Sequence, residues 1–142
     1  MITGAMTSTS EIPHDRSDQL AQVQSGLLAG ESIYCVYDDK GIGSGFIALT
    51  DLRVIILNRS FVSAFPGHKN LAAMTSLPYS QIASVATLAA KSFMGSFFSE
   101  SHIYLVTTGN VHYAVELRGT DRAKYVHDTI LWKITPHPPT GA

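Results

Sequence analysis

Seven short apolar segments, separated by turn residues, constrain the fold of this chain more than any other feature. The segments are rich in β-branched and aromatic residues, which favour strands. Most of the connections between them are short, and short connections indicate antiparallel neighbours in a sheet. The predicted strands are residues 33–37, 45–49, 53–57, 72–77, 82–89, 102–107 and 111–117.

One helical pattern precedes these strands and another follows them. The first covers residues 17–29, and its apolar stripe consists of Leu20, Val23, Leu27 and Leu28. The second covers residues 121–134, and its stripe consists of Ala123, Val126, Ile130, Leu131 and Ile134. Trp132 lies off this second stripe, so we expect it to matter less for packing.

This order of elements predicts a mainly β fold. We expect a seven-stranded antiparallel barrel or strongly bent sheet, with an N-terminal helix and a C-terminal helix that caps the open end. A plain β-sandwich is the alternative architecture, because periodicity alone does not separate the two. We expect one domain over residues 15–135, between flexible tails at residues 1–14 and 136–142.

Composition limits the classes of partner and the cellular compartment that we expect for this chain. The net charge of −1 gives no basic field for nucleic acid or for an anionic membrane surface. The single cysteine, Cys35, allows no internal disulfide, and its place in an apolar strand predicts a small buried side chain. No apolar run is long enough to span a bilayer. We therefore expect a cytoplasmic protein.

Three short motifs carry a resemblance to a known family. Residues 27–31 read Leu-Leu-Ala-Gly-Glu, residues 50–53 form a Thr-Asp-Leu-Arg corner between two apolar strands, and residues 77–82 read Leu-Pro-Tyr-Ser-Gln-Ile. Their order and spacing resemble the bacterial pleckstrin-homology-like (YokE-like) domains, over about residues 17–134. The resemblance implies a pleckstrin-homology-like barrel with a C-terminal helix. It does not imply one function, because such folds include lipid binders, peptide binders and oligomeric scaffolds.

No motif in the chain indicates catalysis. The sequence has no Gly-x-Ser-x-Gly elbow, and its histidines and cysteine lack the spacing of metal ligands. In the corner at residues 50–53, Thr and Asp favour a structural turn, with Arg53 paired to Asp51 or to a nearby carbonyl. We expect no catalytic residue, no metal and no cofactor.

Two further segments bear on the partner. The turn Asp38-Asp39-Lys40 has two acids and one base where a phosphoinositide site needs several bases, so we expect no phosphoinositide specificity. The segment 91–100 has an unusual concentration of large apolar side chains for a connection between strands. An assumed two-residue turn at Gly109-Asn110 also points two side chains of the neighbouring strand outward. The resulting candidate interaction surface is Phe93, Met94, Phe97, Phe98, Ile103 and Leu105.

We interpret this surface as the contact of a non-catalytic interaction module, with a protein partner or a second copy of the chain. Two alternatives stay open for the aromatic residues. They could cover the rim of the barrel, or residues 93–98 could make the chain a peripheral domain that binds membrane lipid. Low positive charge disfavours lipid, because a shallow anchor normally needs a second signal.

Overall fold

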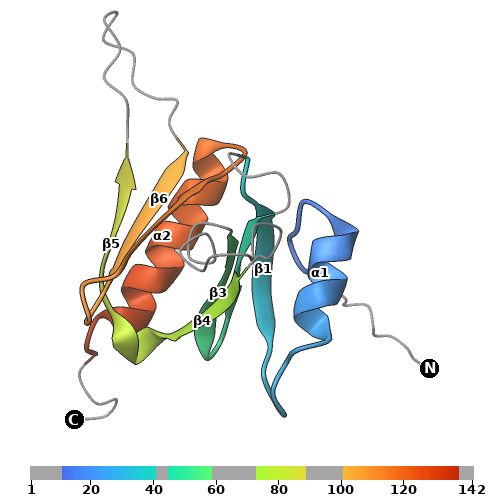
Figure 1. The fold of residues 1–142 in the computed structure, drawn as a ribbon, viewed down its shortest axis with the longest axis horizontal. Helices are drawn as coiled ribbons and strands as arrows, with labels where there is room; N and C mark the ends of the chain where they lie inside the picture. Colours follow the sequence, from blue (N-terminus) through green and yellow to red (C-terminus); the bar gives the residue numbers. More distant parts are fainter. Residues whose placement is uncertain (1–10, 41–44, 59–72, 89–100, 138–142) are drawn as a thin grey trace, which may run out of the picture.

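Two antiparallel sheets and two helices make up the part of the chain that the structure describes, a computed structural model covering residues 11–40, 45–58, 73–88 and 101–137. Figure 1 shows their arrangement. The helices are α1 (Ser17–Gln24) and α2 (Thr120–Ile134), with a short 3-10 helix, η3 (Tyr79–Gln81). The strands are β1 (Ile33–Asp38), β2 (Phe46–Thr50), β3 (Arg53–Asn58), β4 (Ala73–Pro78), β5 (Ile82–Leu88), β6 (His102–Thr107) and β7 (His112–Glu116).

The strands follow one another in both sheets. The first sheet has the order β1-β2-β3-β4, and the second has the order β5-β6-β7, with η3 at the corner between them. All strand pairs are antiparallel. The predicted mainly β fold with seven strands is therefore confirmed, as a bent sheet and not as a closed barrel.

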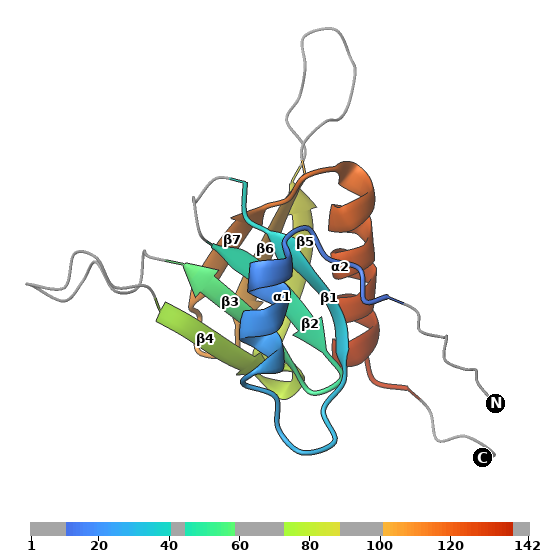
Figure 2. The ribbon, with the colours of Figure 1, turned by 90° about the vertical axis from the view of Figure 1, so that its right-hand side faces the viewer.

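The first sheet is covered on both faces, which explains why β2 and β3 read as nearly continuous apolar runs. One face of β2 packs toward the second sheet and α2, through Ile47 and Leu49. The other face packs against α1, where Phe46 and Ala48 belong to one buried cluster with Val23. Figure 2 shows α1 lying across this outer face.

Both helices bury a narrower stripe than the sequence predicted. The α1 helix ends at Gln24, before the predicted end at residue 29, and Leu28 is 58% exposed in the segment that follows. In α2, Ala123, Val126 and Ile130 are buried, and Leu131 is 44% exposed. The prediction that Leu131 packs into the core was wrong. It lies one position beyond Ile130, about 100° around the helix, past the edge of the buried face.

The N-terminal segment is attached to the free edge of β1. The backbone N–H of Val36 donates to the carbonyl of Pro13 (3.0 Å), and the N–H of Asp15 donates to the carbonyl of Val36 (3.1 Å). His14 thus forms a parallel bridge with Val36, at the end of the segment we had expected to be a flexible tail. Pro13 has no N–H to donate, so this pairing does not extend toward residue 12.

Candidate functional site

Four of the six predicted surface residues, Phe93, Met94, Phe97 and Phe98, lie outside the described residues. They belong to the connection between β5 and β6. Their role in an interface therefore stays a prediction from the sequence.

The other two, Ile103 and Leu105, were placed on the wrong face. Both are buried in the main core, with exposed fractions of 0% and 1%. We had assumed that Thr107 lies opposite His112, but Val106 does, so the β6–β7 register differs by one residue. Side chains alternate between the two faces of a sheet, and a shift of one residue moves a whole set to the opposite face.

On the outer face of this sheet, Tyr104, His112 and Asn110 form a hydrogen-bonded chain. His112 Nδ1 contacts the Tyr104 hydroxyl, and His112 Nε2 lies 3.0 Å from the Oδ1 of Asn110. All three side chains lie on the solvent side of the sheet, and none of them lines a pocket described below. Across the described ranges, no three His, Cys, Asp or Glu residues gather closely enough to hold a metal ion.

Two of the three motifs behind the family resemblance, residues 27–31 and 50–53, meet in one buried ion pair. The Glu31 side chain is fully buried and accepts hydrogen bonds from Arg53 at both carboxylate oxygens (2.8 and 2.9 Å). Thr50 donates to the same carboxylate (2.6 Å), and its hydroxyl accepts from the backbone N–H of Leu52 and Arg53. Arg53 therefore pairs with Glu31 and not with Asp51, and the corner has the structural role that the sequence indicated.

This arrangement also lowers the pKa of the Glu31 carboxyl. The hydrogen bonds from Arg53 lower the pKa of Glu31 from 4.5 to about 2, against the opposing effect of burial. Glu31 is thus ionised at all physiological pH values. The ion pair links the segment after α1 to the β2–β3 turn, and Arg53 also donates to the carbonyl of Gly26 (3.0 Å).

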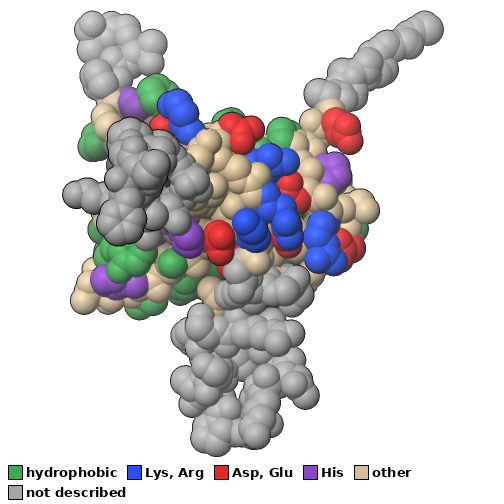
Figure 3. All heavy atoms as spheres, turned by 90° about the horizontal axis from the view of Figure 1, so that it is seen from above, with side chains coloured by type: hydrophobic (Ala, Val, Ile, Leu, Met, Phe, Trp, Pro, Cys, Tyr) green, Lys and Arg blue, Asp and Glu red, His purple; other side chains and the backbone are tan. Residues whose placement is uncertain are grey.

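A second polar network lies where β1 ends and α2 begins. Arg118 pairs with Asp38 (2.8 Å), and Arg122 pairs with Asp15 (2.8 Å). Asp39 is 3% exposed and accepts from the backbone of β7. Seen from this end of the molecule, basic and acidic side chains lie side by side (Figure 3). Both arginines are already held by carboxylates of the protein.

Two open pockets lie between β1 and α2, and both are lined by Tyr125. The first has a volume of about 390 Å³ and is also lined by Pro13, His14, Tyr37, Asp121 and Arg122. The second has a volume of about 410 Å³ and is also lined by Tyr34, Asp128, Thr129, Trp132 and Lys133. We call them together the β1–α2 groove, defined by Pro13, Tyr34, Tyr37, Arg122, Tyr125 and Trp132.

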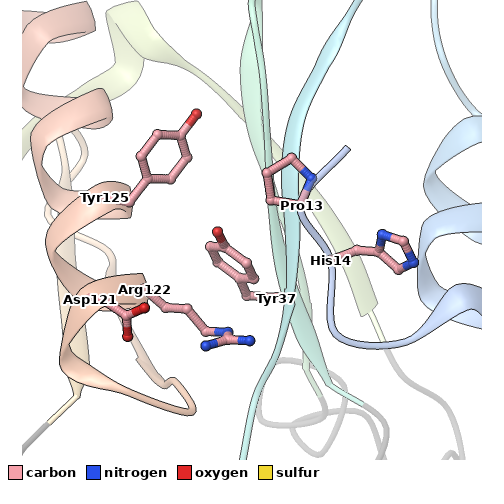
Figure 4. A pocket seen from close by; sticks show the side chains of 6 residues that line it. All are labelled: Pro13, His14, Tyr37, Asp121, Arg122 and Tyr125. Atoms are coloured by element: carbon pink, nitrogen blue, oxygen red, sulfur yellow. The ribbon is translucent and has the colours of Figure 1, made fainter. Parts of the chain in front are cut away.

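Aromatic side chains come from both walls of this groove. Figure 4 shows Tyr37 from β1 and Tyr125 from α2 extending into the space between the two elements. Tyr125 and Trp132 are two helical turns apart, so they share one face of α2. They are 42% and 64% exposed, although large aromatic side chains usually bury most of their surface.

A β-bulge brings Tyr34 to the same wall as Tyr37. The register of β1 against β2 shifts between Ile33 and Cys35, so Ile33 packs on the α1 side and Tyr34 packs on the α2 side. In a regular strand, Tyr34 would point to the same side as Val36, toward α1. The bulge therefore adds Tyr34 to the aromatic lining.

The cations along the groove are engaged by the protein. Arg122 lies over the ring of Tyr37 (5.3 Å) while it pairs with Asp15. Lys133 lies over the rings of Tyr34 (5.3 Å) and Tyr79 (5.6 Å) and donates to the carbonyl of Asp51. Burial raises the pKa of Tyr37 to about 12, so its hydroxyl stays protonated and can donate a hydrogen bond.

The sequence analysis missed this groove, although one signal was visible. Tyr125 and Trp132 stand off the apolar stripe at a spacing of seven residues, which places two aromatic side chains together on an unburied helix face. The β1 wall gave no such signal. Tyr34 and Tyr37 point to the same side of the sheet only because of the bulge, and the sequence does not show the bulge. Cys35 was predicted correctly: it is fully buried, and burial raises the pKa of its thiol to about 12.

Comparisons with known proteins bear on the fold. The chain is similar to the crystal structure of a pleckstrin homology domain from Shewanella amazonensis SB2B, with 21% identity and a TM-score of 0.58 over 91% of this chain and 94% of that one. It is also similar to a DUF1696 family protein with a pleckstrin-homology domain from Shewanella loihica PV-4, with 20% identity and a TM-score of 0.58 over 85% and 95%. No family model and no curated protein sequence matches the chain.

These likenesses show that the chain has the bacterial pleckstrin-homology-like fold, as the resemblance in its motifs implied. In the described part of the chain, no helix is both long enough and apolar enough to cross a membrane.

Proposed function

We propose that this pleckstrin-homology-like domain is a non-catalytic binding module that takes up an extended segment of a partner protein in the β1–α2 groove. The observation that carries the proposal is the exposure of Tyr125 and Trp132 on the α2 face that lines the groove. Aromatic side chains contribute most of the binding energy at many interfaces, because they bury a large area with few rotatable bonds.

The shape of the groove supports an extended ligand. One wall is β1, the outer strand of its sheet, and the N-terminal segment already lies along part of its edge. Two pockets that share Tyr125 form an elongated site, which suits several consecutive residues better than a compact small molecule.

The chemistry of the groove supports binding and not catalysis. A general base needs a pKa near the working pH, and the Tyr37 hydroxyl is shifted well above that range. Arg122 and Lys133 are held by protein groups, so neither is free to stabilise a developing charge. The buried thiol of Cys35 stays protonated and is not a nucleophile.

Selection from a random-peptide library displayed on phage tests the proposal. We expect the full chain to enrich a defined set of peptides, and Tyr125→Ser with Trp132→Ser to lower that enrichment at least about tenfold. Both side chains are largely exposed, so the double variant should fold. Leu28→Ser with Leu52→Ser is the matched control, because it removes two exposed apolar side chains elsewhere and should leave enrichment unchanged. Enrichment that does not depend on Tyr125 and Trp132 would contradict the proposal.

Two alternatives make different predictions. If the partner is a second copy of the chain, light scattering should give a dimer mass that the groove variant reduces to a monomer mass. If residues 93–98 bind membrane lipid instead, the chain should co-sediment with vesicles, and the groove substitutions should leave that binding unchanged.

A further inference from the structure

We infer that the segment recognised by the β1–α2 groove is proline-rich and binds as a polyproline II helix. This inference rests on the proposed function and names the chemistry of its ligand. Proline-rich segments dock into grooves lined by aromatic side chains, because their preformed helix loses little entropy on binding.

The aromatic lining fits proline rings. Tyr34 and Tyr37 stand on one wall, and Tyr125 and Trp132 stand on the other. Pyrrolidine rings are apolar and flat enough to lie against the exposed side chains of Tyr125 and Trp132, and a polyproline II helix presents one every few ångströms along its axis. Tyr125 lines both pockets and so would contact the middle of such a ligand.

The hydrogen-bonding groups of the groove also fit. A proline-rich segment offers backbone carbonyls as acceptors and has few N–H groups to donate. The groove offers donors: neither the Tyr37 hydroxyl nor the indole N–H of Trp132 forms a hydrogen bond with any residue that the structure describes. Backbone carbonyls of a proline-rich segment would satisfy both groups, and the segment would bring few N–H groups that need acceptors of their own.

Charge points to the same class of ligand. Arg122 is neutralised by Asp15, and Asp128 is held by Lys124 (2.6 Å) and by His127 (2.9 Å). The remaining cation, Lys133, donates to a backbone carbonyl and faces two aromatic rings. Asp121 adds one acidic group to the first pocket, so among the described residues the groove has no cluster of free positive charges. This matches an uncharged segment better than a phosphorylated or strongly acidic one.

One proline of the chain itself, Pro13, is accommodated at this groove. Pro13 lines the first pocket beside Tyr37 and Tyr125. At the second pocket, the ring of His137 lies against the indole of Trp132 at a tilt of 36°, with 3.7 Å between ring centroids. A partner segment would extend along the groove from Pro13 toward Trp132.

Titration with an acetylated and amidated decaproline peptide tests the inference. The probe is the fluorescence of Trp132, the only tryptophan of the chain. We expect a saturable change with decaproline and none with a Gly-Ser repeat of equal length. Tyr125→Ala should weaken decaproline binding at least about tenfold. Leu131→Ala, an exposed position on the same helix that lines neither pocket, should bind like the wild type.

The outcomes separate this inference from the proposed function. If decaproline does not bind while the phage library still yields peptides that depend on Tyr125, the ligand class is wrong and the binding site stands. If decaproline binds equally well to the wild type and to Tyr125→Ala, the peptide lies elsewhere and the inference is overturned. If neither decaproline nor the library gives binding at the groove, both proposals fail.

Discussion

Replacement of Glu31 by alanine is expected to lower the free energy of unfolding by about 3–5 kcal/mol, because it leaves the Arg53 guanidinium partly buried without its carboxylate. The Arg53 side chain is only 17% exposed, so water replaces the lost partner poorly. The substitution also removes the acceptor of Thr50 and of the Leu28 N–H. Chemical denaturation of the two proteins at neutral pH measures the difference.

The exposed pair Arg16–Asp18 provides the control. Its side chains are 46% and 65% exposed, so Asp18→Asn should leave the free energy of unfolding almost unchanged. The effect of pH gives a second check. The Glu31 pKa is lowered in the folded state, so its contribution is complete above 4.5 and is lost as pH falls toward about 2. The difference in the free energy of unfolding between the wild type and Glu31→Ala should therefore shrink as the pH falls from 4.5 toward about 2. A difference that stays constant over this interval would contradict the lowered pKa of Glu31.

Replacement of Ile130 by alanine should lower the free energy of unfolding by about 2–5 kcal/mol, the usual cost of truncating a fully buried aliphatic side chain. Ile130 is 0% exposed and packs into the core formed by both sheets and α2. Leu131→Ala is the matched control on the next residue, and because Leu131 is 44% exposed we expect a loss below about 1 kcal/mol. Equal losses at the two positions would mean that α2 is rotated relative to the structure described here.

The strands could be predicted from the sequence because each of them carries a local signal. Apolar and β-branched runs bounded by turn residues mark all seven, and the predicted bounds agree with the structure to within one or two residues. The two helices were also predictable, because Leu20 and Val23 in the first, and Val126 and Ile130 in the second, stand at helical spacing. Local periodicity was sufficient for these features.

The register of the β6–β7 hairpin was not predictable in this way. Gly109-Asn110 is a typical two-residue turn, but residues 107–111 connect the paired positions, and Asn110 has a φ of 65° inside this longer loop. Loop length sets the register, and a change of one residue reverses the orientation of Ile103 and Leu105. Sequence alone does not separate the two loop lengths.

The groove and the ion pair depend on contacts between distant residues. Arg53 has Asp51 two positions away, yet it pairs with Glu31, because the segment after α1 is folded onto the β2–β3 turn. The groove needs the bulge at Tyr34 and the placement of α2 beside β1, and neither has a local sequence pattern. Of the residues that line the groove, only Tyr125 and Trp132 could have been predicted from the sequence to lie together on an exposed face.

Mapping of backbone amide chemical shifts tests the central claim, binding in the β1–α2 groove, most directly. A peptide selected from the phage library would be added to the isotope-labelled full chain until saturation. The account predicts that the largest shifts fall in β1, Ile33–Asp38, and in residues 122–133 of α2. Largest shifts on the outer face of the β5-β6-β7 sheet, or confined to residues 89–100, with β1 and α2 unchanged, would contradict it.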